Sequence, residues 1–183
     1  MATLAELRES PFELLLELER RSRLAASGRG MEGGQQEEWV GVGFRVGRIR
    51  LVASRSEVRE ILTWPGVTSL PGAKPWLLGL ANVRSQLLPV TDLNAFFGGE
   101  ATTIGRSTRV LMVNHPDVPV GLLVDEVRGF RRFLSSEKVE TMPDIPPGMT
   151  PFLAGAYGNE EEMWGVLGLH GLVESAVFLQ AAR

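Results

Sequence analysis

Few side chains in this sequence could do acid–base or metal chemistry. The chain has two histidines, His115 in a Pro-containing turn and His170 between the last predicted strand and the last predicted helix, and it has no cysteine. A catalytic triad can be built from residues distant in sequence. However, the chain contains neither a Gly-x-Ser-x-Gly elbow nor a pair of histidines at metal-ligand spacing. We therefore predict no catalytic residue, no metal site and no cofactor.

Carboxylates at the ends of apolar runs offer one other enzymatic interpretation. Asp92 and Asp125 each follow such a run, and a pair of carboxylates is the machinery of a glycoside hydrolase. Carboxylates at strand ends more often accept hydrogen bonds from backbone N–H groups, so we expect both to be structural. The acidic run from Glu160 to Glu162 is expected at a hairpin tip and not around a cation, because consecutive strand residues face opposite ways.

A candidate binding residue stands in GLANVRSQLLPVTDL, residues 79–93, where Arg84 separates two apolar arms. Pro89 in the second arm predicts an edge strand or a bulge, since proline cannot donate to a ladder. A guanidinium partly withdrawn from water at such a turn needs a carboxylate that matches its planar fork. We expect Glu60, in SEVREIL, to be that partner, with Glu57 as the second choice.

Two interpretations of Arg84 stay open. It is either a solvated turn residue or the polar hot spot of a protein interface, ringed by Val58, Ile61 and Val83. The apolar residues of the second arm are expected to be buried: Leu87, Leu88, Val90 and Leu93.

The elements that must position these residues are short strands separated by glycine and proline. Residues 39–53 alternate apolar side chains with glycine and arginine on both sides of Gly47 and Arg48, which predicts a hairpin with a two-residue turn. Further hairpins are expected at 109–127 and 155–169, and a helix from residue 170 closes the chain. This pattern favours an all-β barrel or sandwich.

The first 38 residues have a different composition. The segment SPFELLLELERRSR begins with a capping box, with Pro11 at the first helical position, and predicts an amphipathic helix. The following GRGMEGGQQEE has the composition of a flexible linker. We therefore divide the chain into residues 1–38, helix and linker, and residues 39–183, the body. The helix either packs against the body or binds another protein.

Composition and charge narrow the class of protein. The absence of cysteine suits a reducing compartment. We find no apolar stretch long enough to span a bilayer and no signal-peptide pattern, so we expect a cytoplasmic protein. Residues 1–38 carry the net charge of −3 and leave the body neutral, which argues against a nucleic-acid partner. The basic cluster in RGFRRF, residues 128–133, is expected to be a solvated or partner-facing edge.

Four motifs in one order resemble a known family. GLANVRSQLLPVTDL resembles the Gly-x-x-Asn-Leu-Arg-Gly-x-x-x-Pro-x-x-Asp-Leu signature of CheW-like chemotaxis adaptor domains, and EVREIL its Val-x-Glu-Ile element. SLPGAKPW is similar to its Leu-Pro-x-x-Pro loop, and VGLLVDEV to its Val-Gly-x-x-Val-Asp-x-Val strand. The positions in register include Val58, Glu60, Ile61, Gly79, Asn82, Arg84, Pro89, Asp92, Leu93, Gly121, Val124, Asp125 and Val127. The first fifty residues further resemble members of the family that serve the pilus-associated chemosensory system behind twitching motility.

The resemblance implies an all-β fold of two five-stranded SH3-like barrels that share a core, with an N-terminal helix and a short C-terminal helix. It implies a non-catalytic adaptor without a cofactor. Such adaptors bind the cytoplasmic tip of a methyl-accepting chemoreceptor and the regulatory domain of a CheA-type histidine kinase, and they join receptor arrays without inserting into the membrane. By motif, Val58, Glu60 and Arg84 map to the receptor and kinase contact region, with Glu60 and Arg84 as a pair.

Two positions depart from the family pattern. Ser85 stands where the family prefers glycine, and a left-handed serine there would cost about 1 kcal/mol. His170 replaces the usual Asp or Asn before the final helix, which leaves the cap of that helix open. Two alternative functions also remain: a β-barrel hydrolase, and a CheW-like regulatory module that binds a phosphatase or pilus motor component in place of a receptor.

Overall fold

The computed structural model describes residues 38–140, 142, 144–158 and 162–181. The predicted N-terminal helix and linker, up to Glu37, lie outside the described residues, as do Glu160 and Glu161 of the predicted acidic tip. No helix in the described part of the chain has the length and apolar character needed to cross a bilayer.

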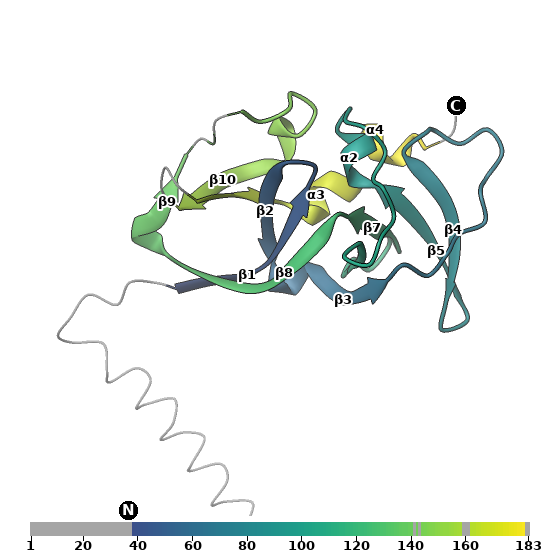
Figure 1. The fold of residues 1–183 in the computed structure, drawn as a ribbon, viewed down its shortest axis with the longest axis horizontal. Helices are drawn as coiled ribbons and strands as arrows, with labels where there is room; N and C mark the ends of the chain where they lie inside the picture. Colours follow the sequence, from purple (N-terminus) through teal and green to yellow (C-terminus); the bar gives the residue numbers. More distant parts are fainter. Residues whose placement is uncertain (1–37, 141, 143, 159–161, 182–183) are drawn as a thin grey trace, which may run out of the picture. The chain divides into compact units, whose positions relative to one another are not determined.

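Two sheets make up the described part of the chain (Figure 1). The first has the strand order β8-β1-β2-β11-β10-β9 and the second the order β3-β6-β7-β5-β4. The strands of the first sheet are β1 (Glu38–Val46), β2 (Ile49–Ser54), β8 (Glu126–Leu134), β9 (Lys138–Val139), β10 (Leu153–Gly158) and β11 (Met163–Leu167). Those of the second are β3 (Val58–Thr63), β4 (Leu77–Val83), β5 (Gln86–Asp92), β6 (Arg109–Val113) and β7 (Gly121–Val124).

Short helical elements lie between these strands and after the last of them. They are the 3-10 turns η2 (Arg55–Glu57), η3 (Ser135–Glu137) and η4 (Thr150–Phe152) and the α-helices α2 (Leu93–Phe96), α3 (Leu169–Val173) and α4 (Ala176–Leu179). The prediction of a single helix that closes the chain from residue 170 is wrong, because two short helices, α3 and α4, stand there. Ser175 is extended, with φ −65° and ψ 142°, and its hydroxyl accepts the N–H of Phe178, so it ends α3 and caps α4.

The all-β architecture with two sheets is confirmed, but the first sheet has six strands and not the expected five. The additional strand is the two-residue β9, which pairs with Ala156 and Tyr157 of β10. The β1–β2 hairpin is also confirmed. Val46 pairs with Ile49, and Gly47 has φ +57°, as the first position of a two-residue hairpin turn requires.

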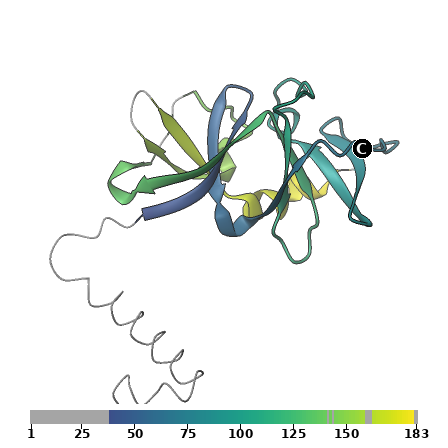
Figure 2. The ribbon, with the colours of Figure 1, turned by 60° about the horizontal axis from the view of Figure 1, so that its bottom comes forward.

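One apolar cluster joins both sheets and α3. It combines Phe44 and Leu51 of the first sheet with Leu111 and Leu122 of the second, and Leu172 of α3 lies among them, each 0% exposed. Figures 1 and 2 both show α3 between the two sheets. The expectation of a shared core is therefore confirmed, and this core holds the two sheets as one body.

Of the two expectations for Pro89, an edge strand or a bulge, the edge strand is wrong, because β5 lies between β4 and β7. A register shift does occur nearby, on the paired strand β4 between Leu77 and Gly79. Leu80, opposite Pro89, exchanges both of its backbone hydrogen bonds with Thr68, so the Leu80–Pro89 pair is a non-hydrogen-bonded pair of the ladder. The nitrogen of Pro89 therefore points away from β4. Pairing of β5 with β7 begins only at Val90. Proline has no N–H, and at Pro89 neither neighbouring strand offers an acceptor that would need one.

The turn between β4 and β5 contains two left-handed residues, Arg84 at φ +50° and Ser85 at φ +66°. This is the backbone of a type I′ turn, which glycine favours. We predict that Ser85→Gly raises the free energy of unfolding by about 1 kcal/mol, because glycine removes the left-handed penalty. Urea denaturation measures the change. The control is Ser107→Gly, which lies on an exposed loop without a positive φ and should bring no gain. Equal effects at both positions would contradict the explanation.

Candidate protein-interaction site

Arg84 and Glu60 form the ion pair that the sequence predicted, with Arg84 Nη2 2.6 Å from Glu60 Oε1. Glu60 lies on β3 and Arg84 follows β4, which are the two opposite edges of the second sheet. The pair is possible because this sheet curls until its edges approach each other. The expectation that Arg84 is withdrawn from water is wrong, since its side chain is 77% exposed, whereas that of Glu60 is 29% exposed. Glu60 therefore holds a guanidinium that presents most of its surface to solvent.

An open groove of about 500 Å³ runs beside this ion pair, between β3 and strands β1 and β8. Val58, Glu60 and Ile61 line it, so the structure brings these three predicted residues together. Val83 is not among its lining residues and packs instead against the apolar cluster inside the second sheet. The other lining residues are Val42, Arg55, Ser56, Arg59, Asn114 and Phe130.

Sequence reasoning missed Phe130, the largest apolar side chain in the groove. It is 62% exposed, and the guanidinium of Arg55 lies 5.7 Å from its ring centroid. The charge of the segment RGFRRF alone gives no indication of this role, whereas an aromatic residue among arginines on an edge strand is a signal for it. The expected edge is present, because this segment belongs to β8, an outer strand of the first sheet.

Leu87, which we expected to be buried, is 66% exposed. Successive strand residues face opposite ways, so Leu87 lies on the exposed side of β5 while Leu88 is buried on the other side. The β4–β5 hairpin also extends beyond the first residue of β7, because pairing of β5 with β7 begins at Val90. Leu87 lines a second hollow of about 370 Å³ together with Arg59, Met112 and Pro116. The two apolar surfaces therefore lie on either side of Arg59.

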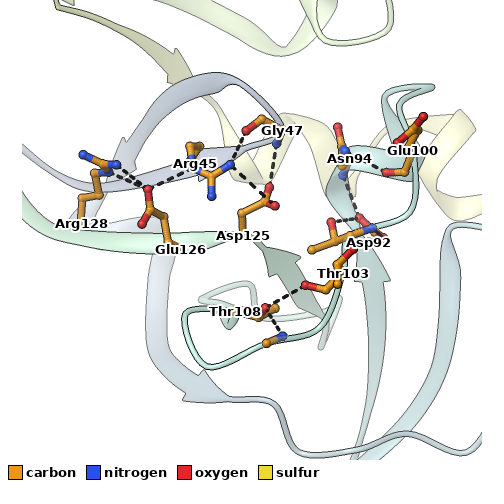
Figure 3. A network of polar contacts seen from close by, with 12 residues as sticks. Arg45, Gly47, Asp92, Asn94, Glu100, Thr103, Thr108, Asp125, Glu126 and Arg128 are labelled. Atoms are coloured by element: carbon orange, nitrogen blue, oxygen red, sulfur yellow. Dashed lines mark hydrogen bonds and ion pairs between the residues drawn. The ribbon is translucent and has the colours of Figure 1, made fainter.

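Asp92 and Asp125 both have structural roles, since each accepts hydrogen bonds from backbone N–H groups (Figure 3). Asp92 is 1% exposed and accepts four hydrogen bonds, from the N–H groups of Asn94, Ala95 and Thr102 and from the Thr102 hydroxyl. It thereby caps α2 and anchors the loop that follows this helix. Asp125 accepts the N–H of Gly47 at 2.7 Å, which ties the β1–β2 turn to the end of β7.

A neighbouring carboxylate, Glu126, fixes the start of β8 (Figure 3). Its Oε1 accepts from Arg128 Nη2 at 2.6 Å and from Arg45 Nε at 3.0 Å. The hydrogen bonds from Arg128 and then Arg45 lower the pKa of Glu126 below its usual 4.5. This network lies outside the groove and joins β1 to β8.

We predict that Glu126→Gln destabilises the protein at neutral pH by less than about 1 kcal/mol, because the ion pairs are partly exposed. A lowered folded-state pKa stabilises the fold fully above the unfolded-state pKa of about 4.5 and loses that contribution as the pH falls through the folded-state value. The difference in thermal midpoint between variant and wild type should therefore shrink from pH 7 towards pH 3. A constant difference would contradict this assignment.

The motif glycines are explained by close approach of neighbouring atoms. Gly79 has φ +144°, and a Cβ there would lie 2.1 Å from the Thr68 carbonyl oxygen. A Cβ on Gly121 would lie 2.5 Å from Val110 Cγ1 and 3.1 Å from Leu88 Cδ2. Asn82, the remaining motif residue, is exposed on β4 opposite Leu87.

The histidines and Glu57 hold the connections between elements. Glu57, our second choice as a partner of Arg84, instead accepts the N–H of His170 at 3.1 Å and so supplies the cap of α3 from a distant segment. His115 Nδ1 accepts the N–H groups of Asp117 and Val118, and its Nε2 lies 2.8 Å from Glu174 Oε1. His170 Nε2 lies 2.7 Å from the carbonyl oxygen of Asn114, so both rings have structural roles.

Comparison with known proteins decides the family. The family model described as CheW-like domain matches residues 40–177. The chain belongs to the CheW-like family. Protein PilI of Pseudomonas aeruginosa is 39% identical over 174 residues, which cover 95% of this chain and 97% of that protein. Chemotaxis protein CheW of Rhizobium meliloti is 32% identical over 57% of this chain and 66% of its own length.

A solved structure supports the fold. The scaffolding protein TtCheW from Thermoanaerobacter tengcongensis superposes with a TM-score of 0.67 at 21% identity, and the alignment covers 80% of this chain and 100% of that one. The chain is therefore a CheW-like scaffold adaptor and a homologue of PilI. Scaffold proteins of this family are non-catalytic, which decides against the β-barrel hydrolase.

Proposed function

We propose that this protein couples a methyl-accepting chemoreceptor to a CheA-type histidine kinase in the chemosensory system of type IV pilus twitching motility. It acts in the cytoplasm and joins receptor arrays at the membrane. The observation that carries the proposal is the Glu60–Arg84 pair, which holds an exposed guanidinium beside an apolar groove. Exposed arginine next to apolar side chains is typical of interface hot spots.

The groove suits the receptor. A receptor tip is a helical hairpin that offers apolar side chains three and four residues apart, and such a ridge fits a groove of exposed apolar residues. Ile61, 39% exposed, and Phe130, 62% exposed, provide that surface. An extended peptide fits β3 less well, because the strand register shifts between Val58 and Glu60, and bulges on edge strands disfavour strand addition.

The tip of the β4–β5 hairpin suits the kinase regulatory domain. Leu87 is 66% exposed beside Arg84, and this surface lies outside the lining of the first groove. Separate surfaces allow an adaptor to hold receptor and kinase at once.

Pull-down of the full chain with a receptor tip and with the kinase regulatory domain, each alone, tests the proposal. Binding of both partners is the expected result, and failure of both would overturn it. Binding of the kinase without the receptor would favour a CheW-like regulatory module that serves a phosphatase or pilus motor component.

The pilus pathway is supported by the similarity to PilI, which extends over 95% of the chain. Comparing the full chain with a variant that lacks residues 1–38 tests whether the N-terminal segment contributes to partner binding. If the segment binds a partner, its removal weakens the affinity for that partner. If it only packs against the body, its removal leaves the affinity unchanged.

A further inference from the structure

The groove between β3 and strands β1 and β8, which we call the receptor groove, is lined by more positive than negative side chains. The side chains of Arg55, Arg59 and Glu60 all line it, but Glu60 is already paired with Arg84. In the described part of the chain neither Arg55 nor Arg59 lies within ion-pair distance of a carboxylate, although both are exposed. The groove therefore presents two uncompensated guanidinium groups beside an apolar floor.

Local structure fixes the side chain of Arg55 and the backbone position of Arg59. Arg55 begins η2, and the guanidinium lies over the Phe130 ring at 5.7 Å from its centroid, at cation–π distance. Arg59 is the residue at which the register of β3 shifts, between the pairs Val58–Val113 and Glu60–Met112. A bulge redirects the side chain that it carries, and Arg59 accordingly lines both the groove and the hollow beside Leu87.

We propose that Arg55 and Arg59 make the groove selective for a receptor helix that carries carboxylates beside its apolar ridge. The apolar ridge packs on Ile61 and Phe130, and the helix's Asp or Glu side chains pair with the two guanidinium groups. Planar guanidinium groups match carboxylates in a bidentate geometry. The inference rests on the proposed receptor role of the groove and adds the chemistry by which one receptor is distinguished from another.

Titration of the full chain with the cytoplasmic hairpin of its cognate methyl-accepting receptor, at low and at physiological salt, tests this inference. Arg55→Gln and Arg59→Gln keep most of each side-chain stem and remove the charge, and each should weaken binding at low salt by about tenfold, as loss of a charge-assisted contact does. The double variant should also show a smaller salt dependence than wild type, because fewer charged contacts remain to be screened.

Arg106→Gln is the matched control, since Arg106 is exposed on a loop and lines neither hollow. In addition, the Arg55→Glu variant should prefer a receptor hairpin whose contact-helix carboxylates are changed to lysine. Unchanged affinity and salt dependence of the double variant, with wild type binding normally, would overturn this inference alone. Absence of binding by wild type would instead overturn the proposed receptor role.

Discussion

Replacing Arg84 with alanine is expected to weaken binding of the partner that contacts it by about 30-fold or more, the change that a hot-spot loss of 2 kcal/mol produces. The thermal midpoint should change by less than about 4 °C, because exposed ion pairs contribute at most about 1 kcal/mol. The side chain is 77% exposed, and its ion pair is with Glu60, which is itself 29% exposed. Titration calorimetry with the receptor tip and the kinase domain, together with thermal unfolding, measures both quantities.

Two variants make this result specific. Arg84→Lys keeps the charge but loses the planar fork, so it should recover only part of the affinity. Arg106→Ala removes another exposed arginine, from a loop that lines neither hollow, and should leave binding unchanged. A large loss of stability in Arg84→Ala with normal affinity would show that the residue is structural.

Local chemistry made much of this fold and site predictable. The β1–β2 turn follows from Gly47, because glycine readily supplies the positive φ that the first position of a two-residue turn requires, and the turn then fixes the register of the hairpin. The Glu60–Arg84 pair was predictable because a guanidinium has few satisfactory partners and the family motif names both residues. The structural roles of Asp92 and Asp125 follow from the preference of strand-end carboxylates for backbone donors.

Features set by distant strands were not predictable. Leu87 has the same apolar character as Leu88, yet it is 66% exposed while Leu88 is 1% exposed, because the two side chains face opposite sides of β5 and the packing of distant elements decides which side is covered. Pro89 is tolerated on an inner strand because its nitrogen points away from β4, towards the side where pairing with β7 begins only at Val90. The groove itself combines β3 with β1 and β8 of the other sheet, and no local pattern shows that contact.

Replacing Asp92 with alanine is expected to lower the free energy of unfolding by about 3–5 kcal/mol, because it leaves several buried donors without a partner. The carboxylate is 1% exposed, and its two oxygens accept two bonds at the start of α2 and two from Thr102. At about 2–4 °C per kcal/mol for a domain of this size, the thermal midpoint should fall by about 10 °C. Differential scanning calorimetry and urea denaturation measure both effects.

The comparison between the two strand-end aspartates tests the physical reason. Asp125→Ala should cost less than Asp92→Ala, because Asp125 is 22% exposed and water replaces part of its hydrogen bonding to Gly47. Asp92→Asn should fall between wild type and alanine, since one oxygen can still cap α2 while the new amide opposes the N–H of Thr102 at the other position. A loss of less than about 1 kcal/mol in Asp92→Ala would mean that the loop after α2 finds other partners for these donors.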